Sequence, residues 1–184
     1  MLFTVAIVGR PNVGKSTLFN RLIKKKHAIV YDKPGVTRDR REGNSVFFDL
    51  QLRVIDTAGL DDSNQDDLSL GMQKQTEIAI NESDAILFVV DGREGINPID
   101  KYFSQQLRKY EIPVILTVNK CERLADQTSQ HDAFSLGFGE PVALSAEHGI
   151  GFDELYSALK PLFSSSLGTT FFLGNAFIDA NCYS

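Results

Sequence analysis

The feature that most constrains this chain is the stretch Gly9–Ser16, GRPNVGKS, which fits the phosphate-binding loop pattern G-x-x-x-x-G-K-[ST]. Residues 3–8 before it form an apolar run that predicts a buried strand, and residues 18–23 carry apolar side chains at helical spacing. Inward-facing backbone N–H groups and the positive end of the helix would surround a polyphosphate. Lys15 would reach the β and γ phosphates, and Ser16 would ligate Mg²⁺. A glycine turn before an ordinary helix is the alternative, and the two correct flanks disfavour it.

Strands and helices are predicted to alternate along the rest of the chain. Apolar runs typical of buried parallel strands occupy residues 85–90, 114–118 and 142–144. A helix is expected from about residue 71 to residue 81, and apolar residues recur at helical spacing over residues 99–110 and 152–162. We therefore expect an α/β protein with the three-layer αβα fold of P-loop NTPases, built on a mostly parallel six-stranded sheet with one antiparallel edge strand. Ligands of such sheets gather at the carboxyl ends of the strands.

A hairpin is predicted between the first helix and residue 56. Val46, Phe48 and Leu50 alternate along the chain, which predicts a half-buried strand, and Leu52 and Val54 lie in the partner strand.

Asp56–Gly59, DTAG, ends the second strand of this hairpin. An apolar strand that closes on Asp, with Gly three residues later, brings a carboxylate to a metal and a backbone N–H to the γ-phosphate. The alternative is a strand followed by an Asx-type turn. Because a phosphate-binding loop lies upstream, we favour the nucleotide-binding interpretation.

Three segments show no clear periodicity. Residues 28–44 form a long loop, which in a compact domain is usually functional or mobile, and residues 61–71 are polar. Residues 164–184 could be a packed strand over 169–173, an interface segment or foreign sequence. We therefore assign residues 1–163 to one domain and the remainder to a C-terminal tail.

Size and composition narrow the class of protein. The 184 residues suit one domain, and the net charge of −5 argues against a surface built wholly for nucleic acid. The two cysteines form no CxxC pair, so we expect neither a disulfide framework nor a zinc site, and a reducing cytoplasm fits. No apolar run approaches the roughly 20 residues of a membrane span. We expect a cytoplasmic monomer with no membrane partner.

Four motifs together resemble a known family. They are GRPNVGKSTLFN at residues 9–20, DKPGVTRDR at 32–40, DTAGL at 56–60 and SAEHG at 145–149. Over residues 2–163 the chain resembles the Era-like branch of the translation-factor (TRAFAC) GTPases, and within that branch the first G domain of the EngA (Der) family. The resemblance implies GTP and GDP as ligands and a G domain over residues 1–163.

The resemblance also assigns the base-binding residues. Asn119, Lys120 and Glu122 would form the guanine motif, with Ser145 helping at the base and Ala146 adding a backbone N–H toward guanine O6. A carboxylate accepts hydrogen bonds from guanine N1–H and N2–H₂, and adenine offers neither donor. The family motif ends in Asp, so the longer Glu122 would need a small loop shift, which would lower guanine affinity or selectivity.

The same resemblance assigns Thr37 to switch I, where its hydroxyl would complete the Mg²⁺ shell beside Ser16 and Asp56. Leu60 stands where other GTPases carry a glutamine that orients water. In relatives of this branch a phosphate-loop asparagine holds K⁺ near the β–γ bridge, and Asn12 stands at the matching position. The alternative is that Asn12 only orders the loop. No side chain is a convincing general base, and the histidines, His148 among them, are expected at the surface.

The predicted catalytic residues are Asn12, Lys15, Thr37 and Gly59. The predicted nucleotide-binding residues are Gly9, Arg10, Pro11, Asn12, Val13, Gly14, Lys15, Ser16, Thr17, Asp56, Thr57, Ala58, Gly59, Asn119, Lys120, Glu122, Ser145, Ala146 and Glu147. The predicted metal ligands are Ser16, Thr37 and Asp56 for Mg²⁺ and Asn12 for K⁺.

Two functions remain open at this point. The first is hydrolysis of GTP to GDP and phosphate as a conformational switch, with the large ribosomal subunit as the partner that the resemblance implies. The family's second G domain and RNA-binding-like domain are absent from these 184 residues, so we expect an isolated first domain or a truncated product. The second is a nucleotide-gated binding module with little hydrolysis. A P-loop kinase of a small metabolite is disfavoured because that class lacks the Asn119-Lys120 motif.

Overall fold

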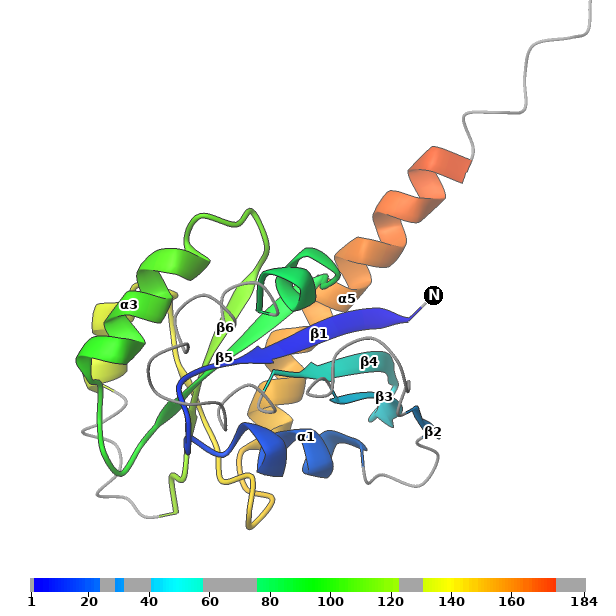
Figure 1. Cartoon of the computed structure of the whole chain (residues 1–184). Coiled ribbons are helices and arrows are strands. Elements are labelled where there is room, and N and C mark those ends of the chain that lie inside the picture. The colour runs from blue at the N-terminus through cyan, green and yellow to red at the C-terminus, as the bar shows by residue number, and fades with distance from the viewer. Residues whose placement is uncertain (1, 24–28, 32–40, 58–75, 123–130, 175–184) are drawn as a thin grey trace, which may run out of the picture.

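The computed structural model describes residues 2–23, 29–31, 41–57, 76–122 and 131–174, with only the backbone described for 29–31 and 167–174. A seven-stranded sheet with the order β2-β3-β4-β1-β5-β6-β7 forms the middle layer (Figure 1). Its strands are β1 (Phe3–Val8), β2 (Ile29–Tyr31), β3 (Arg41–Phe47), β4 (Leu50–Asp56), β5 (Ala85–Asp91), β6 (Val114–Asn119) and β7 (Val142–Ala143). The helices α1 (Lys15–Ile23), α3 (Pro98–Leu107) and α5 (Phe152–Gly174) and the 3₁₀ helix η3 (Phe134–Leu136) pack around the sheet. Residues 76–81 are also helical.

The sheet is mostly parallel with one antiparallel strand, as the sequence predicts. Strands β4, β1, β5, β6 and β7 pair in parallel, and β3 pairs antiparallel with β4. The short strand β2 pairs antiparallel with the outer side of β3, which adds a seventh strand that the sequence pattern of residues 28–44 does not reveal. Strand β3 is therefore the antiparallel strand but not the edge.

Helices cover both faces of the sheet and close two cores. In β1, side chains alternate between the faces: Val5 and Ile7 pack with residues of α1 and α5, whereas Ala6 and Val8 pack with residues 76–81, α3 and η3. Both α1 and α5 lie on the opposite side of the sheet from α3 (Figure 1). A parallel strand covered on both faces is apolar throughout, which explains the continuous apolar runs of β1 and β5.

The β3–β4 hairpin corrects one sequence expectation. Strand β3 ends at Phe47, which pairs with Leu50, so Phe48 and Asp49 form the turn and Leu50 belongs to β4. Phe48 has a positive φ of 56° and is 45% exposed, and Val46 is 43% exposed. The buried aromatic ring is that of Phe47, which is 1% exposed. The turn position shifts the alternation by one residue, and a one-residue shift exchanges the two faces of a strand.

Helix α5 is longer than predicted. It continues through Pro161 to Gly174, so the strand suggested for residues 169–173 is wrong. Its C-terminal turns extend beyond the edge of the sheet (Figure 1). None of the helices in the described part of the chain has the length and apolar character needed to cross a membrane. Residues 175–184 lie outside the described part.

Candidate functional site

The phosphate-binding loop follows β1 and leads into α1, as predicted. Two of its glycines are required by close contacts. A Cβ on Gly9 would collide with the carbonyl oxygen of Val89 in β5, and a Cβ on Gly14, whose φ is 93°, would collide with the amide of Asn119. The loop is therefore packed directly against the neighbouring strand and against the predicted guanine motif, and a larger side chain has no room at either position.

Lys15 is buried under this loop. Lys15 is only 3% exposed, and its Nζ donates to the carbonyl oxygen of Arg10 at 2.8 Å. The ammonium group thus spans the loop from the first turn of α1, at the positive end of the helix dipole. Val13 is fully buried and anchors the loop, whereas the side chain of Asn12 is exposed and its φ is 65°.

The predicted metal-binding strand end lies beside the loop. Asp56 is fully buried and pairs in register with Ile7 of β1. The Thr57 hydroxyl donates to the carbonyl oxygen of Ile7 at 2.7 Å, which holds Thr57 against the end of β1. Ala58, Gly59, Leu60 and Thr37 lie outside the described residues.

The predicted guanine motif is joined to the phosphate-binding loop by hydrogen bonds. Asn119 is 2% exposed, and its amide donates to the carbonyl oxygen of Val13 at 2.8 Å and accepts from the Ala146 N–H at 2.9 Å. The Lys120 ammonium donates to the carbonyl oxygen of Asn12 at 2.7 Å. The Ala146 N–H that was expected to meet guanine O6 is therefore held by Asn119. These contacts bring the three motifs to the carboxyl ends of β1, β6 and β7.

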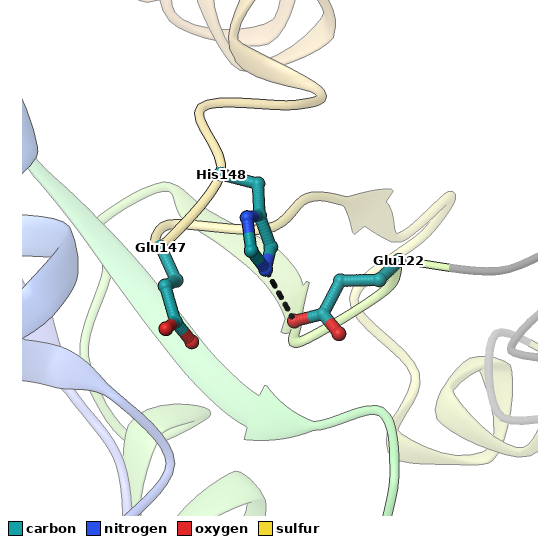
Figure 2. A group of neighbouring side chains, drawn as sticks. All are labelled: Glu122, Glu147 and His148. Atoms are coloured by element: carbon teal, nitrogen blue, oxygen red, sulfur yellow. Dashed lines mark ion pairs between the residues drawn. The ribbon is translucent and has the colours of Figure 1, made fainter.

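Glu122 lies at the rim of this group. Figure 2 shows Glu147 and His148, from the loop after β7, near the Glu122 carboxylate. His148 Nε2 lies 3.6 Å from Glu122 Oε1, and the Ser145 hydroxyl donates to the same oxygen at 3.4 Å. Arg93 Nη2 donates to Glu122 Oε2 at 2.5 Å. The hydrogen bond from Arg93 is the largest cause that lowers the pKa of Glu122 below its ordinary value, so the carboxylate is held in its charged form.

Sequence reasoning missed Asp91, whose carboxylate supports this rim. Asp91 ends β5, is 1% exposed, and accepts from Lys120 Nζ at 2.5 Å. Burial raises the pKa of Asp91, but the Lys120 ammonium and the N–H groups of Arg93 and Glu94 outweigh burial, so the pKa lies below its ordinary value. Asp91-Gly92 looked like a turn in the sequence. Its place at the carboxyl end of a central strand was the signal for a site residue.

The side chain of Arg10 pairs with two carboxylates that lie outside the phosphate-binding loop. Arg10 is 6% exposed; its Nε donates to Asp100 Oδ2 at 3.3 Å, and its Nη2 lies 2.8 Å from Glu94 Oε2. Asp100 belongs to the capping box at the start of α3. Although Arg10 is predicted as a nucleotide-binding residue, its side chain ties the loop to α3, and only its backbone remains for a phosphate.

Arg21 of α1 contacts the loop that is predicted to bind the base. Its Nε donates to the carbonyl oxygen of Ala146 at 2.9 Å, and its Nη2 donates to the carbonyl oxygen of Glu147. No motif in the sequence marks Arg21, because the contact joins residues more than a hundred positions apart.

A comparison with protein-family models matches residues 4–120 to the family described as 50S ribosome-binding GTPase. The chain belongs to this GTPase family. It is 55% identical over 162 residues to the GTPase Der of Cereibacter sphaeroides, which covers 88% of this chain and 33% of that protein. It is 54% identical over 166 residues to the GTPase Der of Jannaschia sp., which covers 90% of this chain and 35% of that protein. The chain thus spans about a third of the length of these relatives.

Solved structures support the same family. Era from Aquifex aeolicus bound to GDP and AlF4⁻ superposes with a TM-score of 0.71 at 32% identity, covering 88% of this chain and 57% of that chain. The G domain of the T. maritima FeoB iron transporter superposes with a TM-score of 0.66 at 26% identity, covering 88% of this chain and 99% of that chain. The Era-like GTPase family predicted from the motifs is confirmed.

Proposed function

We propose that this chain binds GTP and GDP, hydrolyses GTP to GDP and phosphate, and changes shape between the two states. The observation that carries the proposal is the side chain of Asn119. It joins the phosphate loop at Val13 to the base-binding loop at Ala146, so that one buried amide fixes the spacing of the two motifs. A site that grips phosphates at one end and tests the base at the other needs this spacing to be rigid.

The phosphate half of the site has the groups that phosphoryl transfer requires. Lys15 supplies a positive charge beneath the loop, and the start of α1 adds its dipole. GTPases generally use Mg²⁺, which when bound would supply positive charge against the charge that develops on the phosphates. Mg²⁺ prefers oxygen ligands, and the hydroxyl of Ser16 and the carboxylate of Asp56 fit that preference. Thr37 is proposed as a third ligand from the motif alone.

The base half selects guanine through Glu122. Its carboxylate would accept from N1–H and N2–H₂, and the low pKa of Glu122 keeps both oxygens available as acceptors. Adenine offers no donor at these positions, so its binding would leave the acceptor positions that face the base unfilled.

Hydrolysis would depend on K⁺ held at Asn12. Leu60 has no group that could orient water, so hydrolysis needs another source of stabilisation. A cation could offset the negative charge that develops on the leaving group. The Asn12 side chain is exposed on the phosphate loop, while its own carbonyl is held by Lys120. We expect faster hydrolysis in KCl than in NaCl of equal ionic strength, and loss of that difference in Asn12→Ala but not in Asn20→Ala, an exposed asparagine of α1. Equal rates in the two salts would remove K⁺ from the mechanism.

The function is tested by comparing nucleotides and then following phosphate release. GDP should bind at least about a hundredfold more tightly than ADP, because a few kcal/mol of hydrogen bonding is at stake. Single-turnover assays with GTP should then release phosphate. Equal binding of GDP and ADP would contradict the proposal, whereas selective binding without phosphate release would favour the nucleotide-gated module.

As partner we propose the large ribosomal subunit, in the cytoplasm. The support is the description of the matching family as 50S ribosome-binding GTPase. Because this chain spans about a third of those relatives, the test must use this chain itself. Sedimentation with 50S subunits should retain it with a non-hydrolysable GTP analogue and release it with GDP. Equal retention with both nucleotides would contradict a switch.

A further inference from the structure

The residue at the end of the guanine motif has an extra methylene, and a second side chain holds its carboxylate in place. An ordinary guanine motif ends in Asp, whose carboxylate has fewer rotamers than that of Glu122. A Glu side chain loses more conformational freedom when it is fixed to face a base. A neighbouring group that fixes it in advance would reduce this loss.

Arg93 is built to be that group. It follows β5, and its backbone N–H donates to Asp91 Oδ1 at 2.8 Å. The Gly92 N–H donates to the carbonyl oxygen of Asn119 at 2.7 Å, so the turn that carries Arg93 is tied to the guanine motif. A Cβ on Gly92 would come within 2.8 Å of Cys121 Sγ, which shows how closely the two strand ends pack.

From this anchored turn the Arg93 guanidinium reaches the carboxylate. Nη2 lies 2.5 Å from Glu122 Oε2, while Ser145 and His148 approach the other oxygen at 3.4 Å and 3.6 Å. The side chain of Arg93 is 55% exposed and that of Glu122 is 23% exposed, so the pair is partly open to solvent. Each carboxylate oxygen accepts hydrogen bonds from two directions, so Arg93 and a guanine N–H can share Oε2.

We propose that Arg93 is a positioning residue for base selection: its guanidinium holds the Glu122 carboxylate in the orientation that accepts from guanine N1–H and N2–H₂. The proposal rests on the guanine-nucleotide function proposed above. Arg93 itself makes no contact with the base in this scheme, and it acts through Glu122. A planar guanidinium suits this role better than an ammonium group, which is a flexible point charge.

The test uses the whole chain and two nucleotides that differ at one group. Inosine diphosphate lacks the 2-amino group of GDP. The dissociation constant of inosine diphosphate divided by that of GDP therefore reports how well Glu122 accepts from N2–H₂. In Arg93→Ala we expect this ratio to fall about tenfold, which corresponds to one charge-assisted hydrogen bond. The ratio for Arg93→Lys should lie between the ratios for the wild-type chain and for Arg93→Ala. Lys101→Ala, which removes an equal charge from the exposed face of α3, should leave the ratio unchanged.

A double variant separates positioning from direct contact. If Arg93 acts through the carboxylate, Arg93→Ala should change nothing further in a chain that already carries Glu122→Gln. Additive losses in the double variant would mean that Arg93 touches the nucleotide and would overturn the proposal. An unchanged ratio in Arg93→Ala, with wild-type selection of GDP over ADP intact, would also overturn it while leaving the proposed function standing. A wild-type chain that binds GDP and ADP alike would instead refute the proposed function, and this inference with it.

Discussion

Asn119 shows how a single side chain can serve the fold and the site at once. It is almost fully buried, and its amide group has one donor pair and one acceptor, so it can hold two backbone segments together. Here the donor goes to Val13 and the acceptor goes to the Ala146 N–H. Only an amide of this length satisfies both groups, which explains why Asn stands at this position.

Asn119→Ala is therefore expected to lower the free energy of unfolding by about 2–4 kcal/mol. It would leave the Val13 carbonyl and the Ala146 N–H buried without this partner, and each orphaned group costs about 1–3 kcal/mol at most. Urea denaturation in the absence of nucleotide measures the loss. Asn20→Ala, an exposed asparagine of α1, is the matched control and should stay within about 0.5 kcal/mol of wild type. Similar stability of the two variants would contradict the structural role of Asn119.

The charge of Glu122 gives a second prediction, on pH. The hydrogen bond from Arg93 lowers the pKa of Glu122, with smaller contributions from His148 and Ser145, while Glu147 lies nearby. Guanine binding needs the ionised carboxylate, so GDP affinity should fall as pH falls through this low pKa. In Arg93→Ala the pKa returns toward its ordinary value, and the loss should begin at a higher pH.

Calorimetric titration of GDP over the acid range checks this shift. The Glu122→Gln variant is the control, because an amide does not titrate and its acid limb should not depend on Arg93. An acid limb at the same pH in wild type and Arg93→Ala would show that Arg93 does not set the charge of Glu122.

At the scale of elements, the start of α3 is tied to the phosphate loop. Asn97 Oδ1 accepts from the N–H groups of Ile99 and Asp100, and the Asn97 N–H donates to Asp100 Oδ2 at 3.0 Å. The same carboxylate oxygen accepts from Arg10. Burial raises the pKa of Asp100 above its ordinary value, despite these hydrogen bonds. One carboxylate thus caps a helix and balances the buried charge of the loop.

Asp100→Ala should accordingly lower the free energy of unfolding by about 2–4 kcal/mol, because it removes a cap and one partner of a buried cation. We expect GDP affinity to fall as well, since Arg10 lies in the phosphate loop. Urea denaturation and a GDP titration measure the two effects. Asp153→Ala, at an exposed site in the first turn of α5, should leave both nearly unchanged. A GDP affinity in Asp100→Ala equal to that of the wild type would show that the start of α3 does not affect nucleotide binding.

The elements that sequence reasoning placed correctly are those with a local signal. The phosphate loop, β1, β5 and β6 follow from glycine spacing and continuous apolar runs, because a strand buried on both faces leaves no other pattern. The predicted register of the hairpin was wrong by one residue at Phe48. Two adjacent phenylalanines do not indicate which of them is buried. Polar pairs such as Arg93 with Glu122 were not predictable, since residues 29 positions apart meet only after β5 and β6 have paired.

At the scale of the whole molecule, five parallel strands bring their carboxyl ends to one edge of the sheet. The phosphate loop follows β1, Asp56 ends β4, Asp91 ends β5 and Asn119 ends β6. The site is therefore a property of the sheet's topology, because four of these strands end in groups of the candidate site. A ligand that touches all of these ends would stabilise the sheet as a unit, by an amount that grows with its concentration relative to its dissociation constant.

The boundary of the domain is also a property of the whole molecule. We propose that the folding unit ends at residue 163. The Phe163 ring packs against the Phe3 ring with centroids 5.9 Å apart, so this residue is part of the core under β1. The hydroxyls of Ser165 and Ser166 donate to backbone carbonyls of their own helix. A chain ending at residue 166 should keep the unfolding free energy of the full chain within about 1 kcal/mol.

A chain ending at residue 160 is the matched control for that truncation. It lacks Leu162 and Phe163, which pack against the core, and should lose about 2–3 kcal/mol, because burying one large apolar side chain contributes about that amount. Urea denaturation of the three chains, each measured with and without GDP, gives the comparison. If the chain ending at residue 166 lost as much stability as the shorter one, the C-terminal turns of α5 would belong to the folding unit and the boundary would lie further along the helix.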